Sequence, residues 1–379
     1  MNIGSGTVGI ITLPGEYNYG NRLQLYAQIK VFKSFGFNAE SLELRQKNSH
    51  LLTVKNVVKK ALGRPLEEDT STFTTSERQE AFRRFGLYIP TQMFDKPTDV
   101  PVDEYAFFST GSDQVWNPSF ISSREGENPL LRLYHLVSDK AKTTDFLDWY
   151  CLGFCPSGKR IALAPSIGLD FVDAAQSELI RRGANNFSHL SVREHAGSDI
   201  IKSCSGKNAR IICDPTLTLE DEEWRSIAED TLNPKDPYIF TYLLGGMGSS
   251  AGKVLHRIND RAAMPIVHLT DRARIGEVPA GPAEFISLID NAAHVVTDSF
   301  HAAVFASILQ TPLSIVRREG PSSMFSRLET LCQMLGIENK IVGSPEFELS
   351  KADDFGGVPE AIARERHNFM EYLGACLNA

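Results

Sequence analysis

The residues best suited to chemistry lie between Ala292 and Pro312, where a buried strand, a polar turn and a helix are expected in succession. The apolar run before the turn is typical of a strand in a parallel sheet. The turn holds three residues that could cap the following helix, namely Thr297, Asp298 and Ser299. His301 follows at the helix start, where open α/β sheets bind anions and a histidine can donate a proton near neutral pH. The pattern predicts a phosphate or carboxylate substrate, and the alternative is a histidine hydrogen-bonded within the helix start.

Two further charged residues follow predicted strands. Arg193 ends the strand that contains Ser191 and Val192, and its guanidinium can hold a carboxylate or phosphate in a bidentate contact. Its alternative role is an ion pair with a neighbouring carboxylate, either Glu194 or Asp214. Asp113 lies in a polar turn after the strand at 105–110, where it could act as a general acid or base or simply cap the next helix.

The loop after the first strand supplies hydrogen-bonding groups that could bind an acceptor substrate. Asn18, Tyr19 and Asn21 lie there and could line a cleft, although asparagine is also a common turn residue. The glycine-rich loop from Gly245 to Lys253 also follows a strand, but Met247 and Val254 break the phosphate-loop pattern. Nucleotide hydrolysis is therefore not expected, and the loop is interpreted as a flexible connection at the cleft.

Composition narrows the class of protein. The chain has 379 residues, of which 42% are hydrophobic and 23% charged, with a net charge of −8 and no long Lys/Arg stripe for nucleic acid. The six cysteines lack the paired spacing of a metal site, so we expect free thiols and no bound metal. The first apolar segment, 8–13, is too short to cross a bilayer and has no features of a signal peptide, which predicts a cytoplasmic enzyme.

Strand and helix patterns alternate along the chain, which predicts an α/β fold of two Rossmann-like, doubly wound domains facing across a cleft. We expect an N-terminal domain at 1–219 on the acceptor side, and a linker at 220–237 that contains two prolines within four residues. The C-terminal domain, 238–379, should carry the anion or donor site, and its last helix could pack back on the N-terminal domain.

Several segments in order resemble the polysaccharide pyruvyl transferase family: GIITLPGEYNYGNRLQLYAQIKVFKSFGF, STGSDQVWNP, LAPSIG, SVRE, CDPTL, GPAEFISLIDNAAHVVTDSFHAAVFASILQTPLSIV and SSMFSRLETLCQMLGI. The resemblance covers nearly the whole chain apart from 46–78 and 126–155. It implies a GT-B-like pair of domains that uses phosphoenolpyruvate to form a pyruvate ketal on a sugar, with release of phosphate. The acceptor would belong to a cell-surface polysaccharide or a lipid-linked precursor, which would bring the enzyme close to a membrane.

The resemblance also implies roles for the residues above. His301 would be the acid or the phosphate partner, Arg193 would clamp a substrate anion, and Asp113 would serve the acceptor hydroxyl as acid or base. No metal or redox cofactor is required. Many relatives carry an arginine two residues before the histidine and a glycine after it, whereas this chain has Ser299 and Ala302. We therefore place Ser299 in the donor site and expect the missing charge from one of three arginines, Arg317, Arg318 and Arg327, each of which could instead be a surface charge.

Two alternatives stay open. The same two-domain fold could use a nucleotide sugar and act as a glycosyltransferase, in which case a nucleoside diphosphate should bind. A non-catalytic relative that binds a glycan or an anion would show saturable binding and no turnover.

Overall fold

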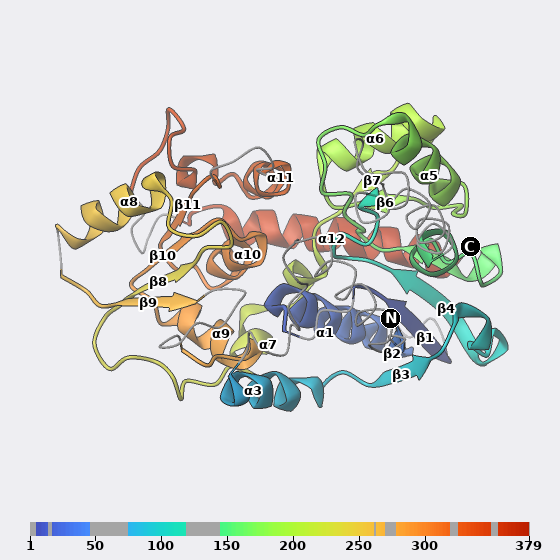
Figure 1. Ribbon diagram of the computed structural model, residues 1–379, viewed down its shortest axis with the longest axis horizontal. Coiled ribbons are helices and arrows are strands. Elements are labelled where there is room, and N and C mark those ends of the chain that lie inside the picture. The colour runs from blue at the N-terminus through green and yellow to red at the C-terminus, as the bar shows by residue number, and fades with distance from the viewer. Residues whose placement is uncertain are drawn as a thin grey trace, which may run out of the picture.

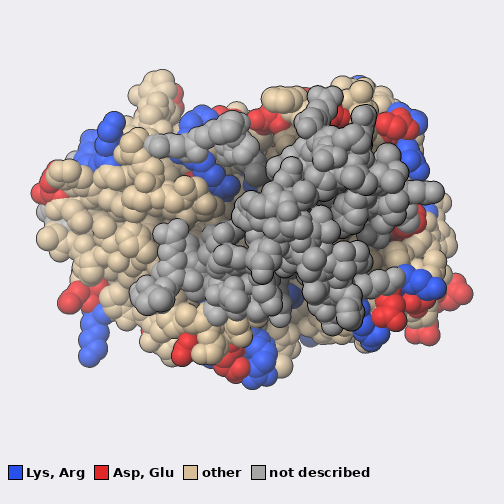
Figure 2. All heavy atoms as spheres, viewed as in Figure 1, with Lys and Arg blue, Asp and Glu red and all other residues tan. Residues whose placement is uncertain are grey.

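The computed structural model describes residues 5–13, 17–45, 75–118, 145–260, 263–269, 278–318, 325–349 and 355–378. These residues form two α/β units that lie side by side in Figure 1. Figure 2 shows one face of the molecule. Along its rim, where the residues are described, Lys and Arg side chains alternate with Asp and Glu side chains. In the described part of the chain no helix is both long and apolar enough to cross a membrane.

The first unit is built on a five-stranded parallel sheet with the order β3-β2-β1-β4-β5. The central strand β1 is almost wholly buried because it pairs on both sides and reads as a continuous apolar run. A separate parallel pair, β6 and β7, continues the unit. The strands are β1 (Thr7–Ile11), β2 (Asn38–Leu44), β3 (Thr91–Phe94), β4 (Tyr105–Thr110), β5 (Arg160–Ala162), β6 (Ser191–Val192) and β7 (Arg210–Ile211). The helices are α1 (Tyr19–Ser34), α3 (Ser76–Gly86), α5 (Ala174–Ala184), α6 (His195–Ser205) and the short α7 (Asp221–Arg225).

The second unit has a four-stranded parallel sheet with the order β11-β10-β8-β9. Its strand β10 is buried along its whole length and leads through a short turn into α10, which is also buried throughout. The strands are β8 (Ile239–Tyr242), β9 (Ile266–Leu269), β10 (His294–Thr297) and β11 (Leu313–Ile315). The helices are α8 (Ser249–Asn259), α9 (Pro282–Asp290), α10 (Phe300–Ile308), α11 (Ser326–Leu335) and α12 (Val358–Leu377).

The two units share one hydrophobic core. The ring of Tyr19 in α1 stacks on Phe285 in α9 with centroids 4.7 Å apart, and Trp224 in α7 meets Phe305 in α10 edge to face at 4.8 Å. The last helix, α12, runs across the middle of the molecule in Figure 1, and its Tyr372 hydroxyl donates to the carbonyl of Ala162 at 2.8 Å. These contacts fix the position of one unit relative to the other.

The predicted α/β class with two Rossmann-like units is confirmed by the parallel sheets and their helices. Three elements escaped prediction, namely α3, β3 and α5. Of the insertion predicted at 46–78, residues 46–74 lie outside the described residues. Its last residues belong to the first turn of α3. Most of the second insertion, up to residue 144, is also outside them.

Candidate functional site

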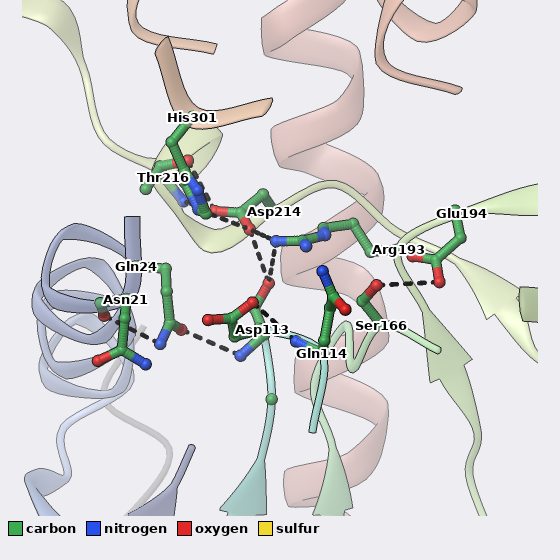
Figure 3. A network of polar contacts seen from close by, with 12 residues as sticks. Asn21, Gln24, Asp113, Gln114, Ser166, Arg193, Glu194, Asp214, Thr216 and His301 are labelled. Atoms are coloured by element: carbon green, nitrogen blue, oxygen red, sulfur yellow. Dashed lines mark hydrogen bonds and ion pairs between the residues drawn. The ribbon is translucent and has the colours of Figure 1, made fainter. Parts of the chain in front are cut away.

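Polar side chains from both units meet where several strands end (Figure 3). Ser112 follows β4, Arg193 follows β6 and Asp214 follows β7, all in the first unit. His301 comes from the first turn of α10 in the second unit. Because carboxyl ends of parallel strands and helix N-termini are the places where α/β proteins bind ligands, this meeting point is the candidate site.

The centre of the site is a buried ion pair between Arg193 and Asp214, whose side chains are 1% and 0% exposed. Asp214 also accepts hydrogen bonds from the Ser112 hydroxyl at 2.7 Å and from the backbone N–H and hydroxyl of Thr216 at 3.0 and 2.7 Å. Burial alone would raise the pKa of Asp214, but the charges of Arg193 and His301 and these hydrogen bonds hold the pKa well below its usual range. Asp214 is therefore a carboxylate at neutral pH.

His301 lies against this carboxylate and keeps some access to solvent. Its Nε2 is 3.6 Å from Oδ2 of Asp214, and its side chain is 11% exposed. Nε2 has no hydrogen-bond partner among the described residues. The imidazole of His301 is thus placed with its Nε2 facing a buried carboxylate at the meeting point of the two units.

Two donors of Arg193 have no acceptor in the part of the chain that the structure describes. Its Nη1 pairs with Asp214, whereas Nε and Nη2 are buried without a hydrogen-bond partner among the described residues. The guanidinium lies over the ring of Phe300 with 4.4 Å to the ring centroid, which fixes its plane. Since buried N–H groups normally find acceptors, these two nitrogens indicate an anionic ligand.

A second buried guanidinium, Arg327 of α11, completes the cationic side of the site. With the Gln114 amide oriented so that both its ends are satisfied, its oxygen accepts from both terminal nitrogens of Arg327 at 3.0 and 2.9 Å. Burial, together with the nearby positive charges of Arg193 and Arg318, lowers the pKa of Arg327 to about 10. Two arginines therefore act electrostatically on the buried charge of Arg327, which an anion would stabilise.

Glu194 has a structural role next to this cluster. One of its carboxylate oxygens accepts from the Ser166 hydroxyl at 3.0 Å and from the backbone N–H groups of Ile167 and Gly168 at 2.8 and 3.0 Å. Glu194 thereby fixes the turn after β5. Of the two carboxylates considered as partners of Arg193 from the sequence, Asp214 is the one that pairs with it.

Asp113 lies in the same network, and among the described residues no helix begins directly after it. Its carboxylate accepts from the backbone N–H of the next residue, Gln114, at 2.8 Å, so the predicted alternative of a helix cap is wrong. Its charge also acts on Arg327, whose pKa it raises. The role of Asp113 as a general acid or base remains a prediction.

The three residues predicted for the acceptor side occupy different environments. Asn18 caps α1 by accepting from the backbone N–H of Asn21 at 3.0 Å. Asn21 is buried and donates from its amide to the carbonyl of Leu13 at 2.7 Å, which leaves its amide oxygen without a partner among the described residues. Tyr19 does not line the site, because its ring is fully buried in the shared core and its hydroxyl donates to the carbonyl of Ala280 at 2.8 Å.

The remaining predicted donor residues lie around the ends of β10 and β11. Ser299 is buried at the start of α10, and its backbone N–H donates to the Thr297 hydroxyl at 3.0 Å. Arg317 is half exposed and pairs with Glu329 at 2.8 Å. Of the three predicted arginines it is therefore the one that lies most at the surface.

Arg318 lines a pocket of about 110 Å³ beside the glycine-rich loop at 245–248. Asp298 holds this loop by accepting from the backbone N–H groups of Leu244 and Gly245, both at 2.7 Å, and pairs with Arg318 at 3.2 Å. The pocket is therefore a small cationic recess at the edge of the second sheet.

Sequence reasoning missed Asp214 and Ser112 as members of the site. Both follow strands in the first unit, so the rule that selected Arg193 also applied to them. Gln24 was missed because nothing in an amphipathic helix marks it, yet it accepts from the Ser112 backbone N–H at 3.0 Å and ties α1 to this loop. Within the described residues, no group of three or more His, Cys, Asp or Glu is arranged to hold a metal ion.

Comparison with known proteins gives one clear family match. The family model described as polysaccharide pyruvyl transferase matches residues 18–318. This range includes Arg193, Asp214 and His301, whereas Arg327 lies beyond its end. A search of curated proteins finds no match.

Several solved structures align over nearly the full length. The UDP-GlcNAc 2-epimerase from Neisseria meningitidis bound to UDP-GlcNAc is 10% identical, with a TM-score of 0.44 and coverage of 98% of this chain and 93% of that one. The N-terminal domain of trehalose-6-phosphate phosphatase from Candida albicans is 9% identical, with a TM-score of 0.43 and the same coverage. The spinosyn rhamnosyltransferase SpnG is 10% identical, with a TM-score of 0.33 and coverage of 98% and 96%.

Proposed function

Because the chain belongs to the polysaccharide pyruvyl transferase family, we propose that it transfers the three-carbon unit of phosphoenolpyruvate to a sugar, forming a pyruvate ketal and releasing phosphate. The observation that carries this proposal is the buried arginine Arg193, two of whose donors have no acceptor among the described residues, beside His301 and Asp214. Such a site suits a small ligand with a carboxylate and a phosphate.

The reaction makes three demands on the protein. A proton must reach the methylene carbon of the donor, a sugar hydroxyl must attack the adjacent carbon, and the phosphate must leave before the second hydroxyl adds. Two new C–O bonds form between C2 of the donor and the two sugar oxygens. The bond between C2 and the oxygen that bridges it to phosphorus breaks. The donor trianion and the diol thus give the ketal carboxylate and hydrogen phosphate, with one hydroxyl proton ending on the new methyl group and the other on the phosphate.

We assign the proton transfer to His301. Its Nε2 lies 3.6 Å from the Asp214 carboxylate, so a proton carried on this nitrogen would have a buried anion beside it. Asp113, which lies below Asp214 in the middle of the network in Figure 3, is proposed to take the proton from the acceptor hydroxyl.

Donor binding is assigned to the arginines. Arg193 offers Nε and Nη2, which lack an acceptor among the described residues, and Arg327 adds a second buried charge on which Arg193 acts. Arg318 lines the pocket beside the glycine-rich loop and would extend the cationic surface, and Ser299 at the start of α10 is proposed to bind the donor as well. Arg317, held by Glu329 at the surface, is proposed only for the outer rim of the donor site.

The acceptor is proposed to be a sugar of a cell-surface polysaccharide or its lipid-linked precursor. Asn21, with a buried amide oxygen that lacks a partner among the described residues, and Asn18 at the start of α1 are its proposed contacts. We propose that the reaction takes place in the cytoplasm, where phosphoenolpyruvate is produced. A lipid-linked acceptor would bring the enzyme to the membrane surface.

One observation favours a second candidate, transfer from a nucleotide sugar. The recess formed by Arg318 and the glycine-rich loop lies at the start of α8, where a diphosphate would meet free N–H groups. The first experiment therefore compares thermal stabilisation by phosphoenolpyruvate and by a nucleoside diphosphate, because a ligand that binds only the folded protein raises the melting temperature. A shift with phosphoenolpyruvate alone supports pyruvyl transfer, and a shift with the nucleotide alone overturns it.

Turnover is then measured as phosphate released from phosphoenolpyruvate in the presence of a panel of sugar acceptors. His301→Ala should reduce release at least about 100-fold, as loss of a general acid does, without changing the melting temperature by much. His256→Ala is the matched control, because His256 is an exposed histidine of α8 that pairs only with Asp260. Equal activity of the two variants would refute the assignment of His301.

A further inference from the structure

We infer that Gly20 is a positioning residue that holds the imidazole of His301 beside Asp214. The inference rests on the proposed function, since it takes His301 as the proton donor. It assigns a role to a glycine that has no side chain to contribute to chemistry and that lies in the other unit from His301.

The contact between the two residues leaves no room for a side chain on Gly20. A Cβ atom at this position would lie 1.9 Å from Nδ1, 2.4 Å from Cε1 and 2.5 Å from Cγ of His301. Real Cβ atoms essentially never approach other atoms within 3.0 Å. The imidazole therefore lies directly on the backbone of the first turn of α1.

Backbone conformation does not explain the glycine. Gly20 is the second residue of α1, and its φ is not in the left-handed region that favours glycine. In such a helical position alanine is the better helix former, because glycine loses more conformational entropy on folding. The close approach of His301 is thus the physical reason for glycine at this position.

Neither side of the contact can move away easily. On the side of α1, Asn21 donates to the carbonyl of Leu13 at 2.7 Å, and Gln24 accepts from the backbone N–H of Ser112 at 3.0 Å. Tyr19 is held by its stacking on Phe285.

On the other side, α10 is buried along its whole length between the shared core and its sheet. A side chain at position 20 would therefore displace the imidazole ring rather than the helices. The ring would move away from the Asp214 carboxylate, 3.6 Å from its Nε2. Gly20 thus couples the packing of the two units to the position of the proposed proton donor.

The test is a double-mutant cycle on thermal stability with Gly20→Ala, His301→Ala and the double variant. Gly20→Ala alone should lower the melting temperature by about 5 °C or more, because two groups overlap in a packed region. In the His301→Ala background the same change should be neutral or stabilising, because the ring is gone. An equal loss in both backgrounds would overturn the inference, and this readout does not depend on activity.

Activity and titration give the second readout. Gly20→Ala should reduce phosphate release at least about 10-fold through kcat, with little change in donor KM, and should shift the imidazole titration of His301 followed by NMR. Gly86→Ala is the matched control, because a Cβ there meets nothing within 4 Å. If His301→Ala is inactive while Gly20→Ala keeps full activity and an unchanged titration, the role of Gly20 fails and the proposed function stands. If His301→Ala is fully active, the assignment of His301 as proton donor fails, whereas a wild type that releases no phosphate with any acceptor would refute the proposed function. In both cases the stability cycle still decides the contact.

Discussion

Replacing Asp214 by asparagine removes one charge from the buried centre of the site at nearly constant shape. The single amide oxygen of asparagine can still accept from Thr216, whereas its NH2 group takes the place of the oxygen that accepts from the Ser112 hydroxyl and pairs with Arg193. Arg193, which is 1% exposed, would then be a buried cation without its carboxylate. Breaking a buried pair in this way typically costs about 3–5 kcal/mol, a large share of the roughly 5–15 kcal/mol by which domains are stable.

Removing both charges should cost less than removing one. In Arg193→Met combined with Asp214→Asn, no unpaired charge stays buried, and methionine fills much of the volume of the arginine stem. We expect the double variant to be more stable than Asp214→Asn by at least about 1 kcal/mol, measured by urea unfolding at pH 7. Both variants should lack donor-dependent phosphate release.

The effect should also depend on pH. Asp214 has a folded-state pKa well below its unfolded value near 3.9, so its contribution to stability is fully present above about pH 4 and is lost as pH falls towards the folded pKa. The stability difference between the wild type and Asp214→Asn should therefore be constant from pH 7 to pH 5 and narrow below pH 4. A cost under about 1 kcal/mol at pH 7, or a difference that does not narrow in acid, would refute the buried-pair argument.

Three further variants separate structural roles from binding roles. Tyr19→Phe keeps the stacking but loses the hydrogen bond to Ala280, so we expect a cost of about 1 kcal/mol in urea unfolding and unchanged kcat/KM; a loss of acceptor affinity would return Tyr19 to the acceptor side. Arg327→Lys cannot reproduce the paired contact with Gln114, and donor KM should rise about 10-fold, whereas an unchanged KM would exclude Arg327 from the donor site. Glu194→Gln weakens three hydrogen bonds of one carboxylate oxygen and should cost about 1–3 kcal/mol in unfolding; no loss would mean that the turn after β5 does not depend on this charge.

The fold could be predicted from the sequence where strands are buried on both faces. β1, β8 and β10 read as short apolar runs, and each leads into a polar turn and then a helix. The strand β3 gave no such signal, because it lies at the sheet edge and is mostly exposed. The helix α3 is charged on most of its surface, and only the spacing of Ala81, Phe82 and Phe85 marked its buried face.

The site could be predicted only in part. Arg193 and His301 were selected because ligands bind at the carboxyl ends of parallel strands. This rule does not predict which carboxylate pairs with an arginine, or in which direction a side chain points. Tyr19 and Asn21 illustrate this limit, since they are two residues apart at one helix start. One of them points into the shared core, and the other points towards the loop that holds Leu13. The choice between Glu194 and Asp214 as partner of Arg193 depends on how β6 and β7 pair, which is set by tertiary packing.

The division of the site between the two units explains why their shared core is so apolar. His301 belongs to the second unit, whereas Arg193 and Asp214 belong to the first, so the imidazole reaches the carboxylate only when the units are packed together. Trp224 against Phe305 and Tyr19 against Phe285 fix this packing with fully buried rings, and ion pairs such as Arg225 with Asp290 at 3.0 Å lie at the surface of the same contact. Apolar contacts of this kind are insensitive to salt and tolerate little displacement. Aromatic packing is therefore what sets the distance between the imidazole and its carboxylate in this protein.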